Sequence, residues 1–398
     1  MAELKTVACE AIDKITSDLN DISQELWKNP ELNFKEHHAH TILTNFMEKQ
    51  GFHVDRNYKL DTAFRATFGD DRTGPHVAML CEYDALPEIG HACGHNLIAE
   101  LGVAAGVGIK AAMEASGKPI GKLTVLGTPA EEGGGGKVIL INKHAFDNID
   151  VVMMSHPGPY DSVRARMMAI NRVTVTYKGK ASHAAAFPWE GVNALDAAVT
   201  CYQTVSCMRQ QMKPTWRVHG IIKKGGVKPN IIPEEAVLEY NIRAPTMAEL
   251  YVLQEKVERC FESAAIATGC KAEYKYSEVP YLNFISNEAL ASSFETNANS
   301  LGLDFKTHEP PTGDAALASS DIGNVSYHVP TIHPGFYIGT DETNHTKGFA
   351  SAAGAPTAQP YTVLQGKAMA MTAIDIYTNK DLLHKIKTEF DDKPQRKN

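Results

Sequence analysis

Apolar runs of strand length alternate with segments of helix length along the first part of the chain. Residues 76–82, 122–128 and 149–155 are almost continuously apolar, a pattern typical of strands that are covered on both faces. The Ala-rich residues 96–117, between the first two runs, predict a helix. Strands that alternate with helices in this way predict an α/β fold with a mainly parallel central sheet and helices on both faces.

The pattern changes near residue 169. Residues 169–282 predict a strand, a helix, two strands, a helix and a strand, which is the order of a ferredoxin-like α+β unit. The α/β pattern then resumes from about residue 287. We therefore expect one domain built from residues 1–168 and 283–398, with residues 169–282 inserted as a smaller domain.

The first fifty residues predict two helices, separated by the stretch "NPELNF" at 29–34. The stretch "EHHAH" at 36–40 contains residue types that bind metals. It lies on a predicted helix, away from the ends of the strands, so we interpret it as a solvated helix face.

Composition narrows the class of protein. A chain of 398 residues is longer than one core usually supports, and a net charge of −8 disfavours nucleic acid as a partner. No stretch approaches the roughly 20 apolar residues of a membrane span, so we expect no membrane partner. The seven cysteines form no CxxC pair, and the first residues resemble neither a signal nor a transit peptide. We therefore expect a cytoplasmic protein with reduced thiols.

Ionisable residues follow the predicted strands at the points where the strands end. Ligands of open α/β sheets bind beyond the carboxyl ends of the strands, so these residues are expected at one edge of the sheet. Thiolate, imidazole and carboxylate groups are ligands that zinc accepts. The sequence therefore predicts a metal site from the residues that follow three strands and one later loop: Cys93, His95, Glu131, Glu132, His156 and His345.

The adjacent carboxylates Glu131 and Glu132 suggest a division of labour in which one binds metal and the other transfers a proton. Asp84 lies between a strand and the next loop, where it can accept a hydrogen bond from a ligand histidine and orient it. The four glycines at 133–136 leave room for a close approach of backbone and substrate. They do not indicate a phosphate-binding loop, because no Ser or Thr follows Lys137 and two carboxylates would repel a phosphate.

Other histidines carry no such pattern. We interpret His91, His219, His328 and His333 as structural residues or as supports of the site.

Six stretches resemble the motifs of one enzyme family, and they occur in its order: EYDALPEIGHACGH, GTPAEEGGGGK, SHPGP, GKASHAA, PNIIPEEAVLEYNIRAP and NHTKGF. They are similar to the dinuclear-zinc aminoacylase and carboxypeptidase family, peptidase family M20, and especially to its amidohydrolase branch with a cysteine in the metal site. The resemblance extends from about residue 20 to 378. It implies a zinc-exopeptidase-like α/β domain, an inserted lid and dimerisation domain, and a homodimer.

The resemblance also implies roles for individual residues. Cys93 would be the ligand shared between two divalent metal ions, with zinc expected and Mn²⁺ or Co²⁺ as alternatives. Glu131 would be the general base, Asp84 would orient a histidine ligand, and His183 of the inserted domain would steady the oxyanion in the partner subunit's site. The remaining metal ligands would be His95, Glu132, His156 and His345, and the substrate's carboxylate end would be held by Asn230 and Arg243.

The chain departs from the branch at three positions. Asn96 and Ile98 stand where an aspartate and a histidine are common in the branch, and Glu82 stands where the wider family has a histidine ligand. Glu82 is accordingly expected as a weak metal ligand or as none, which bears on whether both metal sites fill, and the departures at 96 and 98 bear on any substrate role of those positions.

The resemblance implies a zinc-dependent hydrolase of amide or peptide bonds in small substrates, and specifically a dipeptidase for dipeptides with basic C-terminal residues such as β-alanyl-lysine. An N-acyl amino acid amidohydrolase, of the aminoacylase or p-aminobenzoyl-glutamate type, is the alternative with the same chemistry. A non-catalytic metal-binding scaffold is the alternative of another class, and a redox role for Cys93 is a third.

Overall fold

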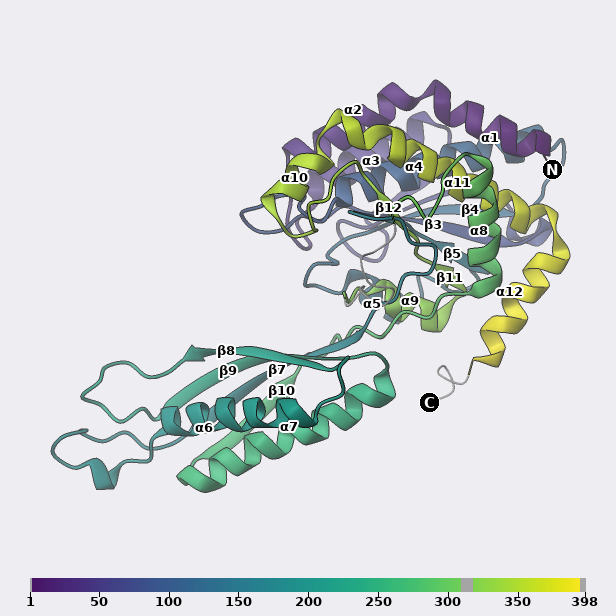
Figure 1. Cartoon of the computed structure of the whole chain (residues 1–398). Helices are drawn as coiled ribbons and strands as arrows, with labels where there is room; N and C mark the ends of the chain where they lie inside the picture. Colours follow the sequence, from purple (N-terminus) through teal and green to yellow (C-terminus); the bar gives the residue numbers. More distant parts are fainter. Residues whose placement is uncertain (1, 309–317, 394–398) are drawn as a thin grey trace. The chain divides into compact units, whose positions relative to one another are not determined.

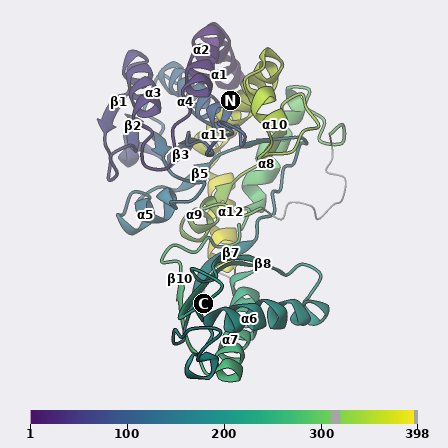
Figure 2. The ribbon, with the colours of Figure 1, turned by 90° about the vertical axis from the view of Figure 1, so that its left-hand side faces the viewer.

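The computed structural model describes residues 2–308 and 318–393. Its contacts divide the chain into two units, Met1–Arg166 with Phe284–Asn398, and Met167–Asn283. These boundaries lie within two residues of those expected from the sequence. The ribbon is shown from two sides in Figures 1 and 2.

The larger unit is built on a six-stranded sheet in the order β1-β2-β4-β3-β5-β11. The pairs β3–β4, β3–β5 and β5–β11 are parallel, whereas β1 and β2 are added in antiparallel fashion at one edge. The strands are β1 (His53–Arg56), β2 (Phe64–Gly69), β3 (His76–Glu82), β4 (Lys122–Thr128), β5 (Val151–Met153) and β11 (Thr331–Ile332), and β6 (His156–Gly158) pairs separately with β12 (Gly335–Tyr337).

Helices cover both sides of this sheet. Helices α4 and α11 lie on one side, and α5 and α9 lie on the other (Figure 1). Every residue of β3 is buried, as its continuous apolar sequence predicts. The helices of the unit are α1 (Ala2–Lys14), α2 (Thr16–Lys28), α3 (His37–Lys49), α4 (His95–Ala115), α5 (Gly136–Asn142), α8 (Glu288–Ser300), α9 (Ile322–His328), α10 (Lys347–Ala353), α11 (Gln359–Thr378) and α12 (Lys380–Asp392).

Helix α4 is the central helix of this unit. It is long and apolar enough to cross a membrane by length and composition, contrary to the expectation that no segment approaches this limit. However, 89% of its most apolar window is buried inside the protein, against β3, β4 and the helices α1, α2 and α11. Its apolar character is therefore explained by its place in the core.

The N-terminal region differs from the prediction of two helices. The first fifty residues form three helices, α1, α2 and α3. The residues before Asn29 form two of them instead of one, because Ile15 leaves helical geometry (φ −112°, ψ 12°) between α1 and α2. Both helices then pack against α4. A break of one residue leaves the spacing of apolar positions nearly unchanged, so the pattern did not reveal it.

The smaller unit is a ferredoxin-like fold, as its order of elements predicts. Its antiparallel sheet has the order β10-β7-β9-β8, and helices α6 and α7 lie on one face of it (Figure 1). A separate core that includes Leu238 and Phe261 lies between sheet and helices. The elements are β7 (Ala169–Lys178), α6 (Ala194–Cys207), β8 (Arg217–Lys224), β9 (Glu235–Ala244), α7 (Met247–Thr268) and β10 (Lys271–Tyr276).

Candidate active site

The turn before helix α4 brings Cys93 and His95 to the carboxyl end of the parallel strands. Gly94, which begins the helix, has φ 79°, and a Cβ at this position would lie 2.6 Å from Cγ of Pro157. Only glycine fits this close, left-handed position. The helix therefore begins directly against the segment that carries His156.

A first group of candidate ligands consists of Cys93, His95 and His156, which come from two different strand ends. The Cys93 Sγ and His156 Nε2 atoms lie 3.5 Å apart, and the rings of His95 and His156 meet edge to face with centroids 5.9 Å apart. The Nδ1 atom of His156 lies 2.8 Å from the Pro157 carbonyl oxygen. This contact fixes the ring and directs Nε2 toward the cysteine.

A second group consists of Cys93, Glu132 and His345. His345 Nε2 lies 3.4 Å from Glu132 Oε1, which lies 3.8 Å from His95 Nε2. His345 itself has φ 67°, a left-handed conformation held by a 2.8 Å hydrogen bond from its backbone N–H to the Ala92 carbonyl. Backbone strain of this kind is concentrated at functional sites.

These two groups fit a pair of divalent metal ions. Within each group the ligand atoms lie within 4.8 Å of one another, and both groups contain Cys93. His95 Nε2 and Glu132 Oε1 are buried without a hydrogen-bond partner in the described part of the chain. Buried polar atoms are normally paired, so these atoms are accounted for if they bind a cation.

Asp84 connects the two sides of the site. Its Oδ1 lies 3.2 Å from His95 Nδ1, and its Oδ2 accepts a 2.9 Å hydrogen bond from the backbone N–H of Glu132. With Nδ1 engaged in this way, Nε2 is the atom of His95 that faces the candidate ligands. Asp84 therefore lies where the sequence placed an orienting residue.

Glu131 is buried behind Glu132 and lies in a third group of candidate ligands with Glu82 and His95. Burial raises its pKa well above the ordinary value, and the neighbouring carboxylates of Glu82 and Glu132 add to this effect. The preceding residue, Ala130, is left-handed (φ 61°) and donates a 2.9 Å hydrogen bond to Glu36 Oε1. The two adjacent glutamates are thus held on a fixed, strained turn.

The glycine run after Glu132 is required by packing. A Cβ at Gly136 would lie 1.8 Å from the Pro129 carbonyl oxygen, and Gly135 has φ 64°. The chain therefore reverses sharply from β4 into α5, which starts at Gly136. This reversal explains the run of glycines, and a phosphate-binding role is not needed to account for it.

The metal-facing side chains also differ in their protonation. Burial, with a contribution from nearby His95, lowers the pKa of His156 to about 4, so this imidazole is neutral and able to bind a metal. Burial raises the pKa of the Cys93 thiol well above its usual value, and Glu132 adds to this effect. A cation is therefore needed to hold Cys93 as a thiolate.

The smaller unit brings His183 and Asn230 together. The Ala184 N–H donates to the Asn230 carbonyl at 3.1 Å, and His183 forms a bridge with Ile231. His183 is exposed, and its Nδ1 accepts hydrogen bonds from the N–H groups of Ala185 and Ala186 at 3.3 and 3.1 Å. In the neutral ring Nε2 then carries the proton and is available as a donor.

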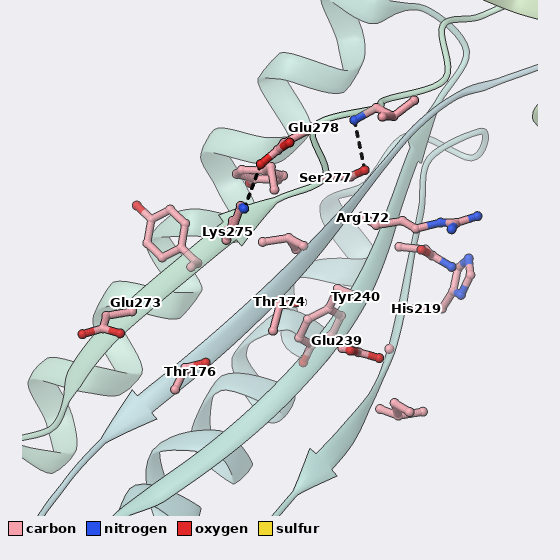
Figure 3. Close-up of a pocket in the computed structure, with 17 residues that line it drawn as sticks. Arg172, Thr174, Thr176, His219, Glu239, Tyr240, Glu273, Lys275, Ser277 and Glu278 are labelled. Carbon is pink, nitrogen blue, oxygen red and sulfur yellow. Dashed lines mark hydrogen bonds and ion pairs between the residues drawn. The ribbon is translucent and has the colours of Figure 1, made fainter. Parts of the chain in front are cut away.

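Arg243 lies on the face of the small sheet that α6 and α7 leave open. Asn241 lies two residues before Arg243 on β9. It pairs with Arg172 of β7 on one side and with His219 of β8 on the other. Figure 3 shows Arg172 and His219 together at one end of the hollow over this face. Burial lowers the pKa of Arg243, and Arg172 adds to this effect. The guanidinium groups of Arg172 and Arg243 therefore lie close enough to interact, whereas the hollow itself contains no candidate metal ligand group among the described residues.

Three buried residues near the site were not recognised from the sequence: Glu36, Lys137 and Asp321. The interpretation of 36–40 as a solvated face was wrong for two of its ionisable residues. Glu36 and His40 are buried, and Glu36 accepts hydrogen bonds from Thr62 and from the backbone of Phe34 and Ala130. A lone glutamate at a helix start carries no sequence signal of such long-range contacts.

The two unusual positions in α4 are buried and structural in this unit. Asn96 donates to Ser23 Oγ at 3.0 Å and to the Ala353 carbonyl at 2.9 Å, so it joins α4 to α2 and α10. Ile98 is fully buried in the same helix.

Comparisons with known proteins identify relatives of this chain. The protein family described as "Peptidase dimerisation domain" matches residues 169–269 of this chain. The chain is 50% identical to the Xaa-Arg dipeptidase of Mus musculus over 97% of its own length and 92% of that protein. It is 26% identical to a p-aminobenzoyl-glutamate hydrolase chain of Escherichia coli, over 98% of this chain and 95% of that protein.

A solved structure shares the fold. The crystal structure of a dinuclear metal-binding peptidase of the M20 family from Bacillus subtilis matches with a TM-score of 0.65 and 18% identity, over 91% of this chain and 99% of that one. The high identity to the mouse protein over nearly the full length of both chains decides the relationship. The chain therefore belongs to the M20 peptidase family and is a hydrolase of that family.

Proposed function

We propose that this protein is a zinc-dependent dipeptidase that cleaves dipeptides with a basic C-terminal residue. The observation that carries the chemistry is the pair of ligand groups that share Cys93, with Glu131 buried beside them. The substrate class rests on the 50% and 48% identity to two proteins named Xaa-Arg dipeptidase, from Mus musculus and Homo sapiens. Zinc fits the mixed thiolate, imidazole and carboxylate ligands.

We assign the metal ligands as Cys93, His95, Glu132, His156 and His345. Divalent ions at these ligands would supply Lewis acidity, which makes a water molecule more acidic and a carbonyl carbon more electrophilic. Glu131 takes the proton of the attacking water and delivers it to the leaving amine. Its burial keeps the carboxyl group away from bulk water, so the proton stays at the reacting atoms.

We assign the smaller unit to substrate binding. His183, with its Nδ1 held by two backbone N–H groups, presents an Nε2–H donor for the oxyanion that develops on the scissile carbonyl in the partner subunit's site. Asn230, joined to the same loop, and Arg243 bind the carboxylate end of the substrate. Arginine suits this role because its planar group binds a carboxylate through two hydrogen bonds.

We further infer that the protein is a homodimer formed through the smaller unit. Strand β8 is an edge strand, and Ile221 and Ile222 are exposed on it. Helix α6 exposes Val199 and Tyr202 one turn apart. Exposed apolar residues beside an unpaired strand edge are typical of a protein–protein interface.

We also infer a reducing, cytoplasmic location. All seven cysteines, which lie in the described part of the chain, are free thiols.

The function is tested with purified, metal-replete protein on β-alanyl-lysine, N-acetyl amino acids and p-aminobenzoyl-glutamate. We expect kcat/KM for β-alanyl-lysine to exceed that for the other substrates by at least about tenfold, which corresponds to about 1.4 kcal/mol of transition-state binding. Preference for an N-acyl substrate would instead indicate an aminoacylase-type enzyme. Absence of turnover on the whole panel would contradict the proposal and favour a metal-binding scaffold.

A further inference from the structure

A fully buried network of charged side chains lies directly behind the candidate metal site. Lys137 Nζ contacts Glu82 Oε2 and lies 2.7 Å from Asp321 Oδ1. Asp321 Oδ2 also accepts a 2.9 Å hydrogen bond from the backbone N–H of Lys137. The side chains of all three residues have no exposed surface. The ammonium is therefore fixed in place by two carboxylates from different elements.

The second oxygen of Glu82 points away from this network. Glu82 Oε1 lies 3.0 Å from His95 Nε2, yet both atoms are buried without a hydrogen bond of acceptable geometry. Two ligand atoms about 2.0–2.2 Å from one ion, at roughly a right angle, lie about 3 Å apart. Glu132 Oε1, 3.8 Å from the same His95 atom and 3.4 Å from His345 Nε2, is also buried without a hydrogen bond. Glu82 and His95 also form a candidate ligand group with Glu131, in which the ligand atoms lie within 4.8 Å of one another.

The charges of this network explain why a lysine is buried at position 137. Two buried carboxylates and one ammonium leave one negative charge in the interior, where an uncompensated charge is very costly. A divalent cation bound at Glu82 Oε1 places positive charge beside this carboxylate and compensates its negative charge. Lys137 meanwhile holds the other oxygen, so the carboxylate cannot rotate away when the cation leaves.

We propose that Glu82 is a further ligand of the metal ion bound by His95, and that Lys137 and Asp321 position its carboxylate for that role. This inference rests on the proposed function, because it requires that the ligand groups bind metal. It adds a sixth side chain to the five assigned above, and it gives the buried lysine of the glycine-rich turn a function.

The inference is tested by titrating Zn²⁺ or Co²⁺ into the chelated full-length protein. We expect wild type to bind two equivalents, and Glu82→Gln to bind the second at least about tenfold more weakly, while the thiolate-to-Co²⁺ absorption of Cys93 persists. Glu100→Gln is a matched control, since it makes the same substitution at another buried glutamate of the same unit, one that lies in none of the candidate ligand groups. If Glu82→Gln does not fold, Glu82→Asp retracts the same carboxylate and is expected to show the same loss.

Unchanged affinity for both equivalents in Glu82→Gln would overturn the inference and leave Glu82 as an ion-pair partner of His95. The proposed function would survive that result if wild type binds two metals and hydrolyses dipeptides. Failure of wild type to bind metal would instead remove the proposed function.

The role of Lys137 has its own test in the melting temperature. Lys137→Met should lower Tm more in chelated protein than in metal-loaded protein, because the metal compensates the buried carboxylates. Adding Glu82→Gln to this variant should recover part of the loss. An equal decrease with and without metal would show that Lys137 serves only packing, and would overturn its positioning role.

Discussion

Oδ1 of Asp84 lies 3.2 Å from Nδ1 of His95, and both side chains are buried. The same carboxylate accepts the backbone N–H of Glu132 through its other oxygen. One side chain therefore orients a candidate ligand and fixes the backbone of another.

Replacement of Asp84 by asparagine should weaken metal binding. The amide keeps one acceptor oxygen, so it cannot serve both His95 and the Glu132 N–H. We expect metal affinity to fall by about 10–100-fold, the usual effect of losing a residue that orients a ligand. Competition with a metal chelator measures this change. Asp61→Asn, at an exposed position of the same unit, is the control, and equal affinities in the two variants would contradict the role of Asp84.

Replacement of Glu131 by glutamine should abolish proton transfer without emptying the site. We expect kcat to fall by at least about 10²–10⁴-fold, because the amide cannot accept the proton. Elemental analysis should find the same metal content as in wild type. Near-normal turnover in this variant would rule out Glu131 as the general base.

Removal of metal should destabilise the protein, since several carboxylates and a thiol converge at the site. At free metal of about 100 times Kd, binding stabilises the folded state by about 2.7 kcal/mol. This corresponds to a Tm higher by roughly 5–10 °C for a domain of this size. Calorimetry with and without chelator measures the shift. Cys93→Ala removes the residue common to both ligand groups, so a metal-dependent shift of the same size in that variant would argue against the assigned ligands.

Glu100 should make stability depend on pH. Burial raises its pKa to about 8, while its value in the unfolded chain is near 4.5. Its contribution to stability is therefore complete below about pH 4.5, and it is lost as pH rises through about 8. Between these values the free energy of unfolding should fall by up to about 1.4 kcal/mol per pH unit from this group. Denaturant unfolding of Glu100→Gln across pH 5–9 should show a flatter profile than wild type, and parallel profiles would contradict this assignment.

Replacement of Ile222 by lysine should disrupt the dimer. A charge on edge strand β8 has to be desolvated when a partner packs against it. Light scattering should report a decrease from twice the chain mass of 43.4 kDa to the single chain mass. Ile266→Lys, at an exposed position near the end of α7, is the matched control. A dimer that survives Ile222→Lys would place the interface elsewhere.

The order of elements followed from the sequence because it depends on local periodicity. Continuous apolar runs predicted β3 and β4, and the change of pattern near residue 169 predicted the inserted ferredoxin-like unit. The rule that ligands gather at the carboxyl ends of parallel strands also predicted that Cys93 and His156 lie together, and their Sγ and Nε2 atoms are 3.5 Å apart.

Tertiary structure alone decided what lies behind the site. Lys137 and Asp321 are 184 positions apart along the chain, yet they form a buried ion pair that also contacts Glu82. Glu36 reaches the turn before Glu131 across 94 positions. A lysine after a glycine run and a glutamate at the start of a helix look like solvated residues, because sequence spacing reports local geometry and not long-range packing. Burial gives them their partners, and burial is a property of the folded chain.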